Sequence, residues 1–140
     1  MACMNLRLDQ REKEGIRILD LRGPLIIGEA ETILRNAIAV LAEGRIVNII
    51  LNLAEVTEID DDGLGALVFS YALIVRSAGR LKLLNVPQDL SVMVLTKLDT
   101  VFEVFTDEQD AINSFFPERA VRRYDILEWV QEQEERSTPE

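Results

Sequence analysis

The spacing of apolar residues near the start of the chain predicts two strands. Apolar residues occupy alternate positions in residues 4–8, and a second apolar stretch, 16–21, ends before Gly23-Pro24. A period of two is typical of half-buried strands, and Gly-Pro ends such a run. We predict a hairpin, with the charged segment 9–15 as its turn.

Two later segments have the spacing of amphipathic helices, in which apolar residues recur every three or four positions. The first follows Gly28 and ends at Gly44, with apolar residues at Ala30, Ile33, Leu34, Ala37, Ile38 and Leu41. The second ends at Gly79, with a predicted core stripe of Leu64, Leu67, Val68, Tyr71, Ile74, Val75 and Ala78.

Further strands are predicted between and after these helices. Residues 46–53 are nearly all apolar, which suits a central parallel strand covered on both faces. Residues 81–86 form the next strand, followed by a short helix at 90–98 and a brief edge strand within 101–105. A last helix begins at a cap formed by Thr106 or Asp107 and carries Ala111, Ile112 and Phe115.

The alternation of strands and helices predicts an α/β fold. Short connections between alternating elements produce βαβ units and a mainly parallel sheet. We expect a mixed sheet of four or five strands with about four helices. Pro117 closes this domain, which we assign to residues 1–117. Residues 118–140 are predicted to be a C-terminal helical extension with a polar tail.

Composition narrows the class of protein. The 140 residues suit a single domain, and no apolar run approaches the length of a membrane span. Because the N-terminus also lacks a signal-peptide pattern, we expect a cytoplasmic protein without direct membrane insertion. The net charge of −10 argues against nucleic acid as a partner.

The chain contains no histidine and a single cysteine, Cys3. Ser-His-Asp and Cys-His catalysis are therefore excluded, and so are histidine-ligated zinc sites. We expect a protein that is not an enzyme and that has no catalytic residue, metal or other cofactor.

An acidic segment joins the central strand to the second helix. Five acids fall within residues 55–62, namely Glu55, Glu58, Asp60, Asp61 and Asp62, and we expect them in a turn. One interpretation is structural: Asp61 or Asp62 caps the helix by accepting backbone N–H groups of its first turn. A second is a magnesium site, as in a receiver-like phosphoacceptor domain, because Mg²⁺ prefers carboxylate oxygens.

The second helix carries three further apolar residues, Ala66, Phe69 and Leu73, opposite its predicted core stripe. Burial against a neighbouring helix or the C-terminal extension is one explanation. The other is a docking surface for a protein, because clustered exposed apolar residues mark interfaces.

The residues around the acidic segment resemble the signature of STAS domains, the family of bacterial anti-sigma-factor antagonists and sulfate-transporter tails. Asn52-Leu53 and the segment 59–65, Ile-Asp-Asp-Asp-Gly-Leu-Gly, are similar to a strand ending in Asn-Leu followed by Asp-Ser-Ser-Gly-Leu-Gly. Weaker similarities surround this motif at residues 21–23, 95–102 and 110–111, so that the resemblance covers residues 4–116. Ile26 departs from the Asp that antagonists often carry there.

The resemblance implies a STAS-like fold and a role in partner switching, a form of signalling that regulates transcription. In the antagonists, a kinase-type anti-sigma factor phosphorylates the second serine of the motif, and the unphosphorylated antagonist binds that factor. Asp61 and Asp62 stand at the two serine positions, so Asp62 is the phosphoacceptor equivalent. Asp62 either imitates phosphoserine or only removes the hydroxyl, and the sequence leaves both open.

The same resemblance implies a partner and a surface. The expected partner is an anti-sigma factor of the kinase type or another signalling protein, and a homodimer is left open. The alternative is a STAS structural subunit of a larger signalling or transport assembly. The predicted partner-binding residues are Asp60, Asp61, Asp62, Gly63, Leu64, Ala66, Phe69 and Leu73.

Overall fold

The computed structural model describes residues 5–119, which form five strands and four helices. The strands are β1 (Arg7–Lys13), β2 (Ile16–Leu25), β3 (Asn48–Ile59), β4 (Arg80–Leu84) and β5 (Val104–Phe105). The helices are α1 (Glu29–Glu43), α2 (Asp61–Arg76), α3 (Val92–Val101) and α4 (Glu108–Asn113). The α/β class predicted from sequence is confirmed. The helix predicted within 118–140 lies almost entirely outside the described residues.

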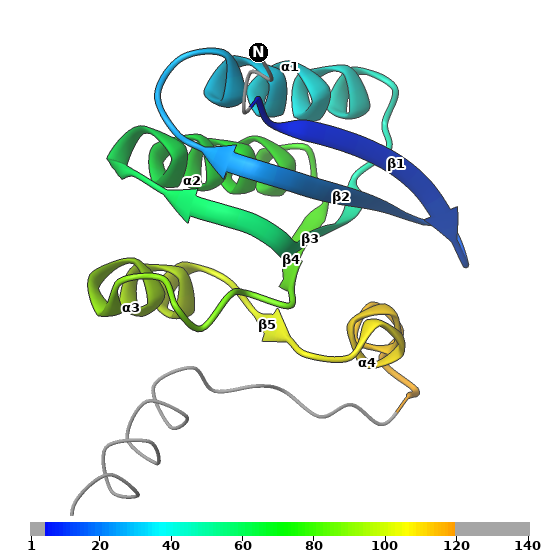
Figure 1. Cartoon of the computed structure of the whole chain (residues 1–140). Helices are drawn as coiled ribbons and strands as arrows, with labels where there is room; N and C mark the ends of the chain where they lie inside the picture. The colour runs from blue at the N-terminus through cyan, green and yellow to red at the C-terminus, as the bar shows by residue number, and fades with distance from the viewer. Residues whose placement is uncertain (1–4, 120–140) are drawn as a thin grey trace, which may run out of the picture.

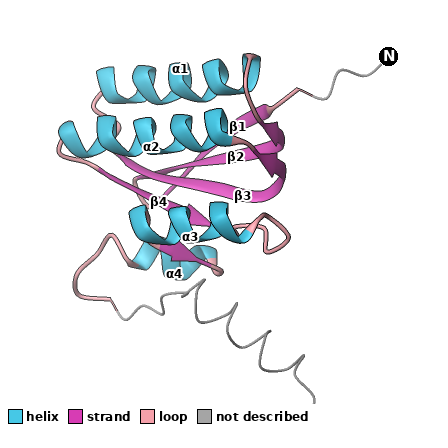
Figure 2. Cartoon of the chain, turned by 90° about the vertical axis from the view of Figure 1, so that its left-hand side faces the viewer, coloured by secondary structure: helices cyan, strands magenta, loops and turns pink. Residues whose placement is uncertain are grey.

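The strands form one mixed sheet in the order β1-β2-β3-β4-β5 (Figure 1). β1 pairs with β2 in antiparallel fashion, and the remaining neighbours pair in parallel. The carboxyl ends of β2, β3 and β4 therefore meet at one edge, where each chain segment turns into α1, α2 or α3. In Figure 2, α2 and α3 lie in front of the strands, α1 lies above α2, and α4 lies behind the strands.

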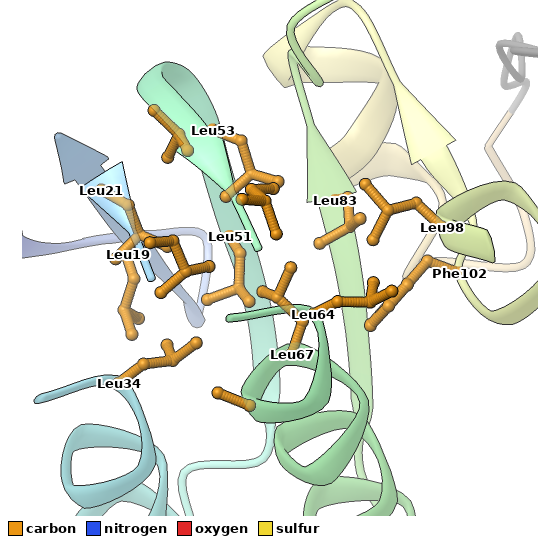
Figure 3. Packing of buried hydrophobic residues seen from close by; sticks show 14 of the residues in the cluster. Leu19, Leu21, Leu34, Leu51, Leu53, Leu64, Leu67, Leu83, Leu98 and Phe102 are labelled. Carbon is orange, nitrogen blue, oxygen red and sulfur yellow. The ribbon is translucent and has the colours of Figure 1, made fainter. Parts of the chain in front are cut away.

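Two apolar clusters hold the helices on the sheet. The larger cluster joins strand leucines, such as Leu19, Leu51 and Leu83, to Leu34 of α1 and Leu67 of α2, all of them fully buried (Figure 3). The smaller cluster lies on the opposite face and comprises Ile16, Ile18, Ile50, Leu84, Phe105, Ala111 and Ile112. Because both faces of the sheet are covered here, the first half of β3 is apolar at every position from 49 to 53 except Asn52.

The predicted hairpin is confirmed, but its turn is shorter than expected. The charged residues 9–13 belong to β1, and the turn is formed by Glu14 and Gly15, with φ of 54° and 81°. Most charged side chains of β1 are exposed, which is compatible with an edge strand. β2 likewise continues beyond Gly23-Pro24 to Leu25.

The acidic segment is only partly a turn, which corrects the prediction. β3 continues to Ile59, six residues past the predicted end of the strand, because β2 pairs with it up to Leu25. Glu55 and Glu58 are therefore exposed strand residues, whereas Val56 between them is buried. Glu55 forms an ion pair with Arg22 of β2 at 3.1 Å.

Within residues 5–119, every helix is too short or too polar to cross a membrane.

Candidate functional site

Asp60 caps α2, where Asp61 or Asp62 was predicted to do so. Its backbone is extended, with φ of −96° and ψ of −175°, and its Oδ1 accepts the N–H of Gly63 at 2.8 Å. The position is shifted because β3 delivers an extended backbone as far as Asp60, and a cap needs that conformation. Asp61 and Asp62 are already helical.

The second carboxylate oxygen of Asp60 joins the start of α2 to the loop between β2 and α1. Oδ2 accepts the N–H of Ile27, in the loop between β2 and α1, at 3.0 Å. Partial burial opposes the charge on this carboxylate, but the N–H groups of Ile27 and Gly63 outweigh it and lower the pKa of Asp60. Asp60 therefore serves the fold and is not available as a free acid.

Asp61 and Asp62 are exposed in the first turn of α2. Neither side chain forms a hydrogen bond or an ion pair with any residue of the described part of the chain. The positive end of the helix dipole favours negative charge at this position. The helix thus presents two carboxylates that are accessible to a ligand or partner.

Gly63 and Leu64 are buried, although both were predicted to bind a partner. A Cβ atom at Gly63 would overlap the carbonyl oxygen of Leu25, so only glycine lets α2 approach β2 this closely. In contrast, a Cβ atom at Gly65 would meet no atom within 4 Å. Gly63 therefore positions the helix, and Gly65 lies on its open side.

The predicted outer face of α2 is largely covered by α1. Ala66 is fully buried, Leu73 is half-buried, and only Phe69, at 41% exposure, presents much of its surface. The guanidinium of Arg35, on α1, lies 4.5 Å from the centre of the Phe69 ring. Of the two explanations for these residues, burial against a neighbouring helix therefore holds for Ala66, because α1 packs along this side of α2.

Three members of the predicted core stripe are exposed instead: Val68 at 38%, Val75 at 47%, and Ala78, which follows the end of the helix. Compared with the prediction, α2 is rotated about its axis so that Ala66 and Ser70 are buried. Both side chains are small enough to let α1 approach closely. Ser70 is fully buried, and its hydroxyl donates to the carbonyl of Ala66 at 2.8 Å. This pair of small residues one turn apart was the sequence signal for a close helical neighbour.

The exposed residues of α2 near its start form a continuous surface, which we call the α2 surface. Its carboxylates lie in the first turn, and its apolar residues occupy the next two turns. The α2 surface comprises Asp61, Asp62, Gly65, Val68 and Phe69. It combines free negative charge with accessible apolar area, as protein-binding surfaces do.

The geometry gives no support to a magnesium site. Within residues 5–119, no three acidic, cysteine or histidine side chains are grouped so that they could hold a metal ion. Glu55 and Glu58 lie in the strand, and both oxygens of Asp60 are occupied by backbone N–H groups. The acidic residues of this segment therefore have different structural roles and do not gather around one metal position.

A family model described as STAS domain matches residues 7–111, three quarters of the chain. The chain belongs to the STAS domain family. A comparison with curated proteins gave no match.

Solved structures share the fold at low sequence identity. TM1081 of Thermotoga maritima, a candidate anti-sigma factor antagonist, is 21% identical. The match covers 76% of this chain and 92% of TM1081, with a TM-score of 0.65. SpoIIAA of Bacillus, an anti-sigma factor antagonist, is 23% identical. The match covers 80% of this chain and 98% of SpoIIAA, with a TM-score of 0.60. The murine anion transporter Slc26a9 is 20% identical over 73% of this chain and 18% of its own length, with a TM-score of 0.55.

Proposed function

We propose that this chain is a partner-switching protein of the anti-sigma-factor-antagonist type, which binds a kinase-type anti-sigma factor through the α2 surface. The observation that carries the proposal is the pair of free carboxylates, Asp61 and Asp62, beside the exposed apolar residues of α2. The role is one of binding rather than catalysis. The chain offers no histidine to a catalytic mechanism.

Asp62 stands where the antagonists carry the phosphorylated serine. A phosphoserine has nearly two negative charges, and the free serine has none, so phosphorylation switches the surface between two states. An aspartate holds one negative charge permanently. The proposed protein therefore keeps one affinity for its partner, which neither a kinase nor a phosphatase changes at this position.

Recovery of the partner tests the proposal. The tagged full-length protein is used to capture binding proteins from the native lysate, and mass spectrometry identifies them. The expected result is an anti-sigma factor with an ATPase-type kinase domain. Recovery of membrane transport components would instead favour a structural subunit of a transport assembly.

A second experiment tests the role of position 62. The Asp62→Ser variant is incubated with the recovered kinase and ATP labelled in its γ-phosphate. We expect the labelled phosphate to appear at position 62 of the Asp62→Ser variant, and we expect no label on the unaltered protein. If the kinase binds the variant but leaves that position unlabelled, Asp62 is not the phosphoacceptor equivalent.

A further inference from the structure

A cleft of about 480 Å³ lies between α2 and α3, over the start of β4. The two helices lie on the same face of the sheet (Figure 2). The cleft is lined from the second half of α2, by Tyr71 and Val75, so it is remote from the acids at the start of that helix. Its volume is within the range of small-molecule sites, roughly 300–1,000 Å³.

One part of the lining is apolar and aromatic. The rings of Tyr71 and Phe102 meet edge to face, with 5.2 Å between their centres. Phe102 is buried beneath the cleft, and Val75 is 47% exposed at its border. This part of the cleft suits a small apolar group.

The charged residues of the lining divide into a paired and an unpaired set. Lys82 is buried and forms an ion pair with Glu103 at 3.0 Å, and it also donates to the hydroxyl of Ser114 at 2.8 Å. In contrast, the side chains of Arg80 and Asp99 form no hydrogen bond or ion pair within residues 5–119. The cleft thus retains one available cation and one available anion.

The hydroxyl of Tyr71 is a third available polar group. It forms no hydrogen bond with the described part of the chain, although its ring is held against Phe102. All three groups belong to residues that line the cleft, and ligand sites usually combine a few such polar groups with apolar lining. Here they comprise a guanidinium, a carboxylate and a phenol.

We propose that this cleft binds a small zwitterion of the α-amino-acid class with an apolar side chain. Arg80 receives the ligand's carboxylate, because a guanidinium offers two parallel N–H donors to it. Asp99 receives the ammonium group, and the side chain of the ligand rests on Tyr71, Val75 and Phe102. The proposal does not depend on the proposed function, since none of these residues belongs to the α2 surface.

An NMR titration of the ¹⁵N-labelled full-length protein tests the proposal. The probes are L-phenylalanine and L-leucine, with glycine, 3-phenylpropanoate and 2-phenylethylamine as matched controls that each lack one recognised group. We expect saturable shifts of the amides of residues 79–82 and 99–103 at about 10 mM of either apolar amino acid. Each control should bind at least about fivefold more weakly, because it leaves one site group unpaired.

Two variants assign the contacts. Asp99→Asn should weaken binding of L-phenylalanine at least about fivefold while leaving binding of 3-phenylpropanoate unchanged, and Arg80→Gln should spare 2-phenylethylamine instead. Both positions are at the surface of the cleft, and thermal unfolding verifies that the variants fold. Absence of saturable shifts, or equal binding of the controls and the amino acids, would overturn the proposal.

Discussion

The carboxylate of Asp60 accepts the backbone N–H of Ile27 at 3.0 Å and so joins the start of α2 to the loop that precedes α1. The same side chain accepts the N–H of Gly63 at 2.8 Å. One residue therefore fixes both the first turn of the helix and its position beside β2. This leaves the next two acids, Asp61 and Asp62, free at the surface.

Replacing Asp60 by alanine should lower the free energy of unfolding by about 1–3 kcal/mol, because a cap and a second hydrogen bond are lost. Asp61→Ala and Asp62→Ala are the matched controls and should change it by less than about 0.5 kcal/mol. Urea denaturation followed by circular dichroism measures all three. Equal losses at the three positions would contradict the assignment of Asp60 as the cap.

The charge of Asp60 should make stability depend on pH. Its pKa is lowered in the folded protein, so its contribution is complete above the unfolded pKa, near 4, and is lost as the pH falls through the folded pKa. Asp60→Asn keeps a capping oxygen but cannot ionise. Glu108, whose pKa is lowered by Arg11, titrates in both proteins and cancels in the comparison.

The stability difference between the unaltered protein and Asp60→Asn should therefore shrink as the pH falls from about 6 to about 3. Urea denaturation at several pH values provides the measurement. A difference that stays constant over this range would show that the charge of Asp60 is not what the N–H groups stabilise.

Gly63 and Gly65 lie two positions apart on α2, yet alanine should have opposite effects at them. Gly63→Ala forces its Cβ into the carbonyl of Leu25, and we expect a loss of at least about 3 kcal/mol or failure to fold. Gly65→Ala meets open space and should stabilise the helix by up to about 1 kcal/mol. Thermal unfolding compares the two, and a stable Gly63→Ala protein would refute the close contact with β2.

Lys82 should matter for the attachment of α4. Its ammonium donates to the carbonyl of Ser114 at 3.1 Å and to the hydroxyl of Ser114 at 2.8 Å, at the end of that helix. Lys82→Met keeps the apolar stem but removes these bonds, and should destabilise the protein by about 1–3 kcal/mol. The exposed Lys97→Met is the control and should be neutral in urea denaturation. Equal stability of both variants would count against this role.

The fold was largely predictable because its strongest signals are local. The apolar stripe of α1 and the apolar run of β3 both form part of the core, and the sequence pattern predicted both elements. The second half of β3 was missed because Glu55, Thr57 and Glu58 have the composition of a turn. These residues are held in the strand by pairing with β2, across two register shifts, which no local pattern reveals.

The candidate site was predictable in position but not in detail. The motif located the start of α2, and Asp61, Asp62 and Phe69 are accessible there as expected. Val68 was predicted in the core stripe but is exposed, and Ala66 was predicted opposite that stripe but is buried. The sequence pattern does not fix the rotation of α2, because the rotation depends on where α1 packs. Whether these residues bind a partner stays a prediction.

The central claim is that the α2 surface binds a kinase-type anti-sigma factor. The most direct measurement is quantitative capture of that kinase from the native lysate by the unaltered protein and by Val68→Glu and Val40→Glu. Val40 is an exposed valine of α1, at 66%, and lies outside the α2 surface, so it controls for added charge. The account predicts equal capture by the unaltered protein and Val40→Glu, with capture by Val68→Glu reduced at least about tenfold. Equal capture by all three proteins, or recovery of no ATPase-type kinase, would contradict it.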